Sequence, residues 1–394
     1  MTKKTPKPVI RFKGFTDEWE QRKCKELCSI TTGKSNTQDQ DEDGLYPFYI
    51  RSDVPVRSNK FLYDCEAVIT IGDGQIGKVF HYVNGKFDLH QRCYKMADFV
   101  GILGKYFFYY FSTKFYDRAI KMTAKATVDS VRMDMISEMD IQYPASSQEQ
   151  RQIVLFLERL DNLLALHQRK YEKLKAIKKA LLEKMFPQGD EKVPRIHFKG
   201  FTDAWEQRKF GEVAQSFEYG LNVAAKEYDG INKYLRITDI DDVSRKFDTD
   251  NLTSPDTELV AVENYRLVDG DILFARTGAS VGKSYIYRVS DGLVYFAGFL
   301  IRAKIKPEYD AEFVFQNTLS ESYEKYVQIT SQRSGQPGVN AQEYSDYVFY
   351  LPTYDEQQKI GALFRNLDNL ITLYQRKCEK LKNIKKSFLE KMFV

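Results

Sequence analysis

Two phrases in this chain occur twice, and they dictate how it can fold. Residues 11–23 read "RFKGFTDEWEQRK", and residues 197–209 read "HFKGFTDAWEQRK". A longer phrase fills 148–186 and returns at 355–393, where 23 of 39 positions are identical. The offset is 186 residues at the front and 207 at the back, so the second middle segment is 21 residues longer. A period near 200 residues exceeds solenoid repeats and indicates the tandem duplication of a domain with its trailing segment.

The trailing segments have the apolar spacing of coiled-coil helices, with apolar side chains alternating at intervals of four and three residues. In the first copy this stripe contains Ile153, Leu157, Leu160, Leu164, His167, Tyr171, Leu174, Lys178, Leu181 and Met185. In the second copy it contains Ile360, Phe364, Leu367, Ile371, Tyr374, Cys378, Leu381, Lys385, Phe388 and Met392. Lys178 and Lys385 are polar interruptions of the stripe at equivalent places. Because a single long helix cannot bury such a stripe, we predict that the two helices pair with each other, antiparallel, around a pseudo-two-fold axis.

The middle segments alternate short β-rich runs with turn residues and then continue into helical runs, which predicts an α+β fold. We therefore expect two tandem mixed α/β domains, each followed by a long helix. The predicted boundaries are 1–145 for the first domain, 146–187 for its helix, 188–195 for a linker, 196–352 for the second domain and 353–394 for its helix. Thr16 and Asp17, with Thr202 and Asp203, resemble helix starts before the repeated tryptophan. We interpret Trp19 and Trp205 as anchors that dock each domain entry onto the helices, and an ordinary core tryptophan is the equal alternative.

The charge of the chain is small overall but unevenly distributed. The net charge is +4, yet residues 148–186 and residues 355–393 each hold nine basic and five acidic side chains. The remainder has 41 basic and 45 acidic residues. The basic helix faces are compatible with binding to DNA or to a partner, and equally with solvated lysines. The start of the chain lacks a signal-peptide pattern, and the apolar run at 99–111 is interrupted by Lys105, so we expect a cytoplasmic protein without a membrane span.

Each middle segment contains a glycine-rich loop that resembles a phosphate-binding loop only in part. The first has Gly72, Gly77 and Lys78, but the following residue is Val79 instead of the serine or threonine that holds magnesium. The second ends in Lys283 and a serine, but Thr277 replaces its first glycine. Strand-like rather than helical sequence follows both. We predict a tight loop between strands that can bring Lys78 or Lys283 near a phosphate.

No sequence motif of an active site or metal site stands out. The chain has no HExxH motif and no motif typical of amino-methyl transfer. The five cysteines are scattered, and a single CxxxC pair without histidines nearby is weak evidence for zinc. We predict no catalytic residue, no metal site and no bound cofactor in this chain.

Side chains that read base edges are concentrated instead in "TSQRSGQPGVNAQEY" at 330–344. Arginine pairs with guanine, and asparagine or glutamine with adenine. The equivalent first-copy stretch, 121–134, differs in chemistry, so one scaffold is predicted to read two different targets. A solvated polar loop is the simpler alternative. The candidate DNA-binding residues are Arg51, Gln75, Lys78, Lys121, Lys125, Arg132, Arg236, Arg276, Lys283, Gln332, Arg333, Gln336 and Asn340.

These features together resemble the specificity subunits of type I restriction–modification systems. The resemblance covers nearly the whole chain and depends on the duplication, on the repeated "LDNL…QRK…EKLK…IKK…LEKMF" helices, and on a proline followed by "EQxxI". That junction comprises Pro144, Glu149, Gln150 and Ile153, with Pro352, Glu356, Gln357 and Ile360 in the second copy.

The resemblance implies two target recognition domains that each read one half of a split DNA sequence, while the coiled coil sets the gap between the halves. It also implies two methyltransferase subunits that use S-adenosylmethionine, and two restriction subunits that use ATP and magnesium. Double-stranded DNA would be the ligand, and this chain would have no active site. Two other hypotheses stay open: a DNA-modifying enzyme in its own right, and a coiled-coil scaffold that binds only proteins.

Overall fold

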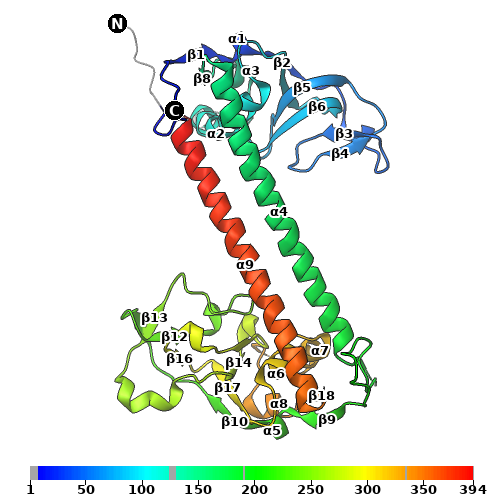
Figure 1. Cartoon of the computed structure of the whole chain (residues 1–394), viewed down its shortest axis with the longest axis vertical. Helices are drawn as coiled ribbons and strands as arrows, with labels where there is room; N and C mark the ends of the chain where they lie inside the picture. Colours follow the sequence, from blue (N-terminus) through cyan, green and yellow to red (C-terminus); the bar gives the residue numbers. More distant parts are fainter. Residues whose placement is uncertain (1–7, 124–129, 190, 333–334, 394) are drawn as a thin grey trace. The chain divides into compact units, whose positions relative to one another are not determined.

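The computed structural model describes residues 8–123, 130–189, 191–332 and 335–393. These residues form two compact units. Unit 1 comprises Met1–Leu166 with Lys377–Val394, and unit 2 comprises His167–Arg376. Each unit thus contains one middle segment together with parts of both trailing segments (Figure 1). In the described residues, no helix is long and apolar enough to cross a membrane.

Unit 1 is built on a sheet with the strand order β2-β7-β5-β6-β3-β4, accompanied by the separate pair β1-β8. Its strands are β1 (Trp19–Lys23), β2 (Ser29–Thr32), β3 (Tyr46–Tyr49), β4 (Val56–Ser58), β5 (Tyr63–Ile71), β6 (Phe80–Leu89), β7 (Cys93–Ala97) and β8 (Asp140–Pro144). Its short helices are α1 (Cys24–Leu27), η1 (Thr37–Asp39), α2 (Gly104–Thr123) and α3 (Met133–Ser137). Helix α2 supplies a row of buried aromatic rings, including Tyr106, Phe107 and Phe111, to the core beside this sheet.

Unit 2 contains a sheet with the order β10-β17-β14-β15 and the smaller pairs β11-β13, β12-β16 and β18-β9. Its strands are β9 (Glu206–Lys209), β10 (Ala214–Tyr219), β11 (Ala225–Glu227), β12 (Lys233–Leu235), β13 (Thr253–Pro255), β14 (Ile272–Ala275), β15 (Ser284–Ile286), β16 (Val294–Phe296), β17 (Leu300–Ile305) and β18 (Val348–Leu351). Its short helices are α5 (Phe210–Val213), η2 (Ile237–Asp239), η3 (Leu259–Tyr265), η4 (Gly278–Ser280), η5 (Val289–Asp291), α6 (Ala311–Asn317), α7 (Glu321–Thr330) and α8 (Ala341–Ser345).

The two units share one topology, which confirms the predicted duplication of an α+β domain. The order β2-β7-β5-β6 matches β10-β17-β14-β15, and a parallel pair follows in each unit, β3-β6 and β12-β16. Gly33 and Gly220 occupy equivalent close approaches of two backbones. A Cβ atom on Gly33 would lie 2.1 Å from the carbonyl oxygen of Leu89, and one on Gly220 would lie 2.1 Å from that of Ala297. Only glycine fits at these crossings.

The repeated phrase at each domain entry forms a strand, so the predicted helix starts at Thr16 and Thr202 are wrong. Strand β1 pairs antiparallel with β8, and β9 pairs with β18. A run of about five residues is too short to gain stability as a helix, whereas pairing with a partner strand satisfies its backbone hydrogen bonds. The buried Trp19 and Trp205 pack into their unit cores, where Trp205 contacts Phe186 at 6.2 Å between ring centroids.

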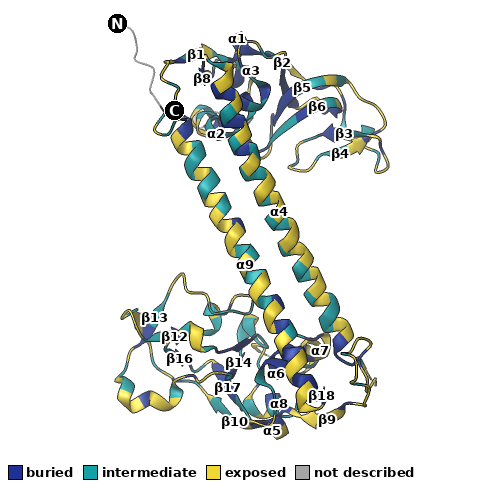
Figure 2. Cartoon of the chain, viewed as in Figure 1, coloured by how far each residue is buried: buried dark blue, intermediate teal, exposed yellow. Residues whose placement is uncertain are grey.

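The trailing segments are the long helices α4 (Ser147–Met185) and α9 (Tyr354–Met392), as the heptad spacing predicts. In unit 1 the beginning of α4 lies beside the end of α9, where Phe156 and Phe388 meet edge to face at 4.7 Å. In unit 2 the later part of α4 lies beside the earlier part of α9, where His167 contacts Tyr374 at 5.4 Å. The helices are therefore antiparallel within each unit. Most buried positions of the two helices lie near the helix ends, and most positions between them are intermediate or exposed (Figure 2).

The repeated "EKMF" endings insert into the core of the unit that contains the other copy's domain. Phe393 packs on Tyr106 and Tyr110 in unit 1, at 5.5 and 5.6 Å between ring centroids. Phe186 packs on Phe313 at 5.4 Å in unit 2. Burial of a phenylalanine side chain contributes about 1.5–3 kcal/mol.

The glutamine of each "EQxxI" junction ties helix and domain together with the same bonds. The amide nitrogens of Gln150 and Gln357 donate to the carbonyl oxygens of Pro144 and Pro352, at 2.8 and 2.9 Å. Their amide oxygens accept from the backbone of the domain, at Leu103 and Asp310 respectively. Both glutamines are buried. The repeated glutamine therefore has a structural role, because its amide group bonds to the backbone inside the protein.

Candidate nucleic-acid interface

In unit 1, four loops meet where strands of the sheet end: residues 33–36, 50–54, 72–78 and 90–92. Backbone bonds join them, because Gly72 donates to the carbonyl of Arg92 at 2.8 Å and Lys34 donates to that of Leu89 at 3.1 Å. The His81 ring nitrogen lies 3.1 Å from the carbonyl of Ser52. We call this cluster the unit 1 surface; its polar side chains include Asn36, Arg51, Asp73, Gln75, Lys78, Gln91 and Arg92.

A single carboxylate positions the two arginines of the unit 1 surface. Asp73 Oδ2 accepts from Arg51 at 3.2 Å and from Arg92 at 2.7 Å. The aspartate is the least exposed of the three side chains, so both guanidinium groups extend outward from it. An arginine held in this way keeps donors for the O6 and N7 atoms of guanine or for a phosphate.

His90 holds the backbone of Arg92 through a hydrogen bond. Burial lowers the pKa of His90, and the positive charge of Arg51 lowers it further. The neutral ring can therefore accept, and its Nδ1 receives the backbone N–H of Arg92 at 3.1 Å. Burial also raises the pKa of the neighbouring Cys93 thiol to about 12, so this cysteine is no thiolate nucleophile at neutral pH.

The equivalent loops of unit 2 have a different chemistry. Residues 219–222, 276–283, 297–299 and 335–340 meet there, through bonds that include Gly220 N to the carbonyl of Leu300 and Val339 N to that of Arg276. We call this cluster the unit 2 surface. It combines Arg276 and Gln336 with two aromatic rings, those of Tyr219 and Phe299.

Arg276 lies between these two aromatic rings. Its guanidinium carbon is 5.1 Å from the ring centroid of Tyr219 and 5.8 Å from that of Phe299. Its Nε is buried without a hydrogen-bond partner in the described residues. Tyr219 and Phe299 are 44% and 55% exposed, unusually high for aromatic rings. An exposed ring next to a stacked arginine is the arrangement that contacts bases in many nucleic-acid sites.

Seven of the thirteen predicted contact residues lie in the loops of these surfaces, and two of the seven, Lys283 and Asn340, are described with their structural partners below. Arg51, Gln75 and Lys78 are on the unit 1 surface, and Lys78 lies over the ring of Tyr116 at 5.5 Å. Arg276 and Gln336 are on the unit 2 surface. The amide of Gln336 lies against Gly278, whose φ is +71°, and a Cβ there would lie 2.9 Å from Gln336 Nε2.

Three predicted residues, two of them in the loops of the unit 2 surface, have structural partners. Arg236 forms a two-pronged ion pair with Asp239, at 2.8 and 2.9 Å. Lys283 pairs with Asp242 and is only 16% exposed. Asn340 caps α8 through its side-chain oxygen, which accepts from a backbone N–H at 2.9 Å.

The remaining predictions fall elsewhere. Lys121 is exposed in the last turn of α2, and Arg132 is exposed beside Asp134 at 3.4 Å, just before α3. Gln332 is exposed after α7. Lys125 and Arg333 lie outside the described residues. No observation tests contact with DNA for any of the thirteen, so all remain predictions.

Both glycine-rich loops connect two strands, as predicted, and neither begins a helix of the phosphate-binding kind. Residues 72–79 link β5 to β6, and residues 276–283 link β14 to β15. In the part of the chain that the structure describes, no group of three or more His, Cys, Asp or Glu side chains could hold a metal ion.

Sequence reasoning missed Asn36, Gln91 and Arg92 in unit 1 and Tyr219 and Phe299 in unit 2. Asn36 and Gln91 are hydrogen-bonded to each other across two loops. The position of Arg92 could have been predicted, because the polar sequence "HQR" directly follows a strand-like run and therefore lies in a loop at the end of a strand. The two aromatic residues had none, because the sequence does not tell an exposed ring from a core ring.

Comparisons with known proteins agree with this architecture. A family model described as "Type I restriction modification DNA specificity domain" matches residues 16–176 and 202–383. The type I restriction enzyme EcoDI specificity subunit of Escherichia coli is 22% identical over 95% of this chain and 88% of its own length. The MjaVIII specificity subunit of Methanocaldococcus jannaschii is 22% identical over 95% of this chain and 91% of its own length.

A solved structure shares the fold. The crystal structure of a type I restriction–modification S subunit from M. genitalium superposes with a TM-score of 0.69, at 16% sequence identity, and covers 99% of both chains. With a family match in each repeat and a shared fold along its whole length, this chain belongs to the type I restriction–modification DNA specificity family and has two copies of its domain.

Proposed function

We propose that this chain is the non-catalytic DNA specificity subunit of a type I restriction–modification complex. One observation carries the proposal: two copies of one fold present, at the same strand ends, different sets of side chains of the kinds that can read bases. The unit 1 surface has paired arginines with Gln75 and Gln91, whereas the unit 2 surface has one stacked arginine between aromatic rings. Each copy then reads its own half of a bipartite, non-palindromic target, and the paired helices set the gap between the halves.

The catalytic work belongs to partner subunits in this proposal. Methyl transfer with S-adenosylmethionine, and cleavage driven by ATP and magnesium, take place on methyltransferase and restriction subunits. The names of the related specificity subunits support this division of labour. Double-stranded DNA is the ligand of the chain itself.

Repeated exposed leucines support two copies of one methyltransferase partner. Leu163 and Leu166 on α4 occupy the same repeat positions as Leu370 and Leu373 on α9, and all four are 40–48% exposed. Exposed leucines at equal positions in both units offer the same apolar patch twice. One kind of subunit can dock on each patch. Two restriction subunits then complete the proposed assembly.

The test is selection of bound duplexes from a random library by the chain assembled with its methyltransferase partner. We expect two fixed half-sites separated by unspecified bases. Arg92→Ala should relax base choice in one half-site, and Arg276→Ala should relax it in the other, at a cost of about 1–3 kcal/mol for each lost bidentate pair.

Arg22→Ala and Arg208→Ala are matched controls, because these arginines lie at equal repeat positions on β1 and β9, away from both surfaces. They should leave both half-sites unchanged. A target that is not split into two half-sites would contradict the proposal, and so would methyl transfer by the purified chain alone. If the assembled complex protects no DNA from cleavage in a footprinting experiment, a scaffold that binds only proteins is favoured.

A further inference from the structure

A lysine triplet repeated in both helices lines a cavity in each unit. Lys175, Lys178 and Lys179 of α4 line a cavity of about 270 Å³ in unit 2. Their counterparts Lys382, Lys385 and Lys386 of α9 line one of about 520 Å³ in unit 1. The chain thus repeats a basic cavity as well as a fold. Neither cavity belongs to the surfaces described above.

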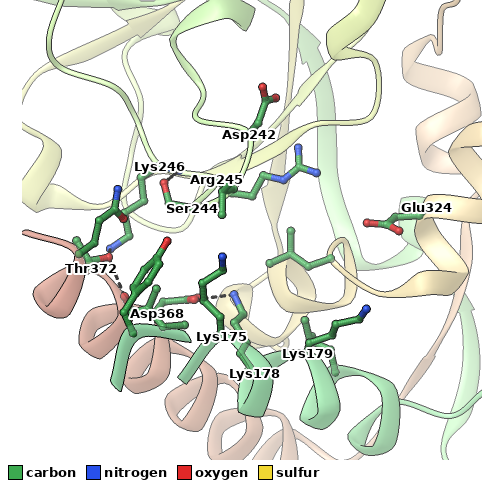
Figure 3. A pocket seen from close by; sticks show the side chains of 16 residues that line it. Lys175, Lys178, Lys179, Asp242, Ser244, Arg245, Lys246, Glu324, Asp368 and Thr372 are labelled. Atoms are coloured by element: carbon green, nitrogen blue, oxygen red, sulfur yellow. Dashed lines mark hydrogen bonds and ion pairs between the residues drawn. The ribbon is translucent and has the colours of Figure 1, made fainter. Parts of the chain in front are cut away.

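The opposite wall of the unit 2 cavity adds two cations. The loop that follows η2 brings Arg245 and Lys246 opposite the lysines of α4, and Lys175 and Lys178 extend from that helix toward the loop (Figure 3). Of the acidic residues in the lining, Asp368 is paired with Lys178 at 2.6 Å, and Asp242 is paired with Lys283 outside the cavity. Five basic side chains therefore face three acidic ones, the third being Glu324.

Two of these cations are half-buried and form no ion pair in the described residues. Lys246 Nζ donates to Thr372 Oγ1 at 2.5 Å, and Lys246 has no ion pair within the described residues. Burial lowers the pKa of Lys246; the nearby charge of Asp368 raises it in part, and the charges of Arg288 and Arg376 lower it. Arg245 Nη1 is buried without a hydrogen-bond partner among those residues. A half-buried cation without an ion pair carries a desolvation cost, and a bound anion would offset that cost.

The backbone of the loop that carries Arg245 and Lys246 is held in a defined conformation. Asp241 fixes the turn by accepting from the backbone of Val243 and Ser244, at 3.2 and 2.6 Å. Arg245 adopts a φ of +55°, which an arginine takes only at a cost of about 1–2 kcal/mol. Such strain persists where the surrounding structure enforces it, and it is common at binding sites.

The unit 1 cavity repeats the charge pattern with other domain residues. Lys385 is paired with Asp161, as Lys178 is with Asp368. Lys114 of α2, Lys382 and Lys386 have no ion pair in the described part of the chain. Four lysines face only Asp117 and Glu390 there.

We propose that each lysine-triplet cavity binds the phosphate group of a phosphate ester. Lysine ammonium groups suit phosphate because they act as compact point charges with freely rotating donors. Two sources carry this group: the backbone of the bound DNA and a free nucleotide. The DNA source depends on the proposed function, whereas the nucleotide source does not.

The test uses a double variant with one change in each cavity, Lys179→Gln with Lys386→Gln, in the full chain assembled with its methyltransferase partner. If DNA supplies the phosphates, the slope of log affinity against log salt should become shallower by about 0.9 for each lost contact, equally for target and non-target duplexes. If a nucleotide supplies them, ³¹P spectra of inorganic phosphate and ATP should broaden with the wild-type chain and not with the variant.

Lys173→Gln with Lys380→Gln is the matched control, because these exposed lysines occupy equal repeat positions on the same helices but do not line the cavities. It should change neither measurement. If the cavity variant behaves like this control in both, the proposal is overturned, while a split target in the same complex would leave the proposed function intact. If the wild-type complex shows no sequence-specific binding, the proposed function fails and the phosphate spectra still decide the inference.

Discussion

At the scale of single residues, the two copies treat one buried glutamate differently. Glu149 in unit 1 receives both prongs of the Arg11 guanidinium, at 2.7 and 2.8 Å. Its counterpart Glu356 in unit 2 is only 4% exposed, and His197 stands at the position of Arg11. Burial raises the pKa of Glu356, although the Trp205 side chain and the charge of His197 oppose that rise. Its Oε1 has no hydrogen-bond partner among the described residues.

We predict that His197→Arg stabilises unit 2. Because the folded state holds the Glu356 proton more strongly than the unfolded state, the free energy of unfolding now falls as pH rises from the ordinary glutamate pKa, about 4.3, through the raised value. A guanidinium partner should lower that pKa, reduce this fall and contribute about 1.5–3 kcal/mol at pH 7. Urea unfolding between pH 4 and 8 measures both effects, in a Trp19→Phe background where Trp205 alone reports.

The reverse change, Arg11→His, is the control for unit 1. It should destabilise by up to about 3–5 kcal/mol, because it leaves Glu149 buried without its partner. Equal pH dependence in the wild type and in His197→Arg would show that Glu356 does not titrate as described.

The candidate contact residues were the least predictable part of the molecule. Arg51 and Arg276 could be proposed from residue chemistry. Their positions, however, depend on a hydrogen bond to Asp73 in one unit and on contact with an aromatic ring in the other, and these partners lie in loops distant in sequence. Arg236 and Asn340 have the same base-reading chemistry, yet the fold uses them for an ion pair and a helix cap. Residue type alone does not separate these roles.

At the scale of elements, the helices are held in register by a repeated ion pair. Lys178 of α4 bonds Asp368 of α9, and Lys385 of α9 bonds Asp161 of α4. Each aspartate also accepts from its domain: Asp368 from Gln316 at 3.0 Å, and Asp161 from the Tyr109 hydroxyl at 2.8 Å. A polar pair within an apolar seam favours one alignment over others.

We predict that Lys178→Met destabilises unit 2 by about 3 kcal/mol. This value is the lower end of the free-energy cost of breaking a buried ion pair. We choose the lower end because each partner is 15% exposed and is therefore partly solvated. A double-mutant cycle with Asp368→Leu should give a coupling energy above about 1 kcal/mol, since removal of both partners leaves no uncompensated charge. Unfolding followed by Trp205 fluorescence measures it.

Lys173→Met serves as the control, because Lys173 is exposed on the same helix and its removal should change stability by less than about 0.5 kcal/mol. A coupling energy near zero between positions 178 and 368 would contradict the register role.

The long helices were predictable because their heptad stripe runs through 39 residues in each copy. The entry strands β1 and β9 were not, because the local capping signal at Thr16 and Thr202 competes with pairing to β8 and β18, about 120–140 residues later. Short strands depend on partners that local sequence does not reveal.

At the scale of the whole molecule, each surface is built within one unit, so the two halves of the target should be separable. We predict that replacing residues 210–347, which lie between the paired strands β9 and β18, with the equivalent segment of another family member changes one half-site and preserves the other. Mapping methylated adenines in cells that contain the hybrid and its partners measures both half-sites. A change in both would show that recognition is shared between the units.

Each domain core is finished by a methionine and a phenylalanine supplied from the other repeat's helix. A gene truncated at the linker would therefore encode a polypeptide whose domain core lacks this methionine and phenylalanine. The methionine and phenylalanine at the end of its own helix would have no core to enter within the same polypeptide. Two such polypeptides would complete each other head to tail, and the product would read a palindrome.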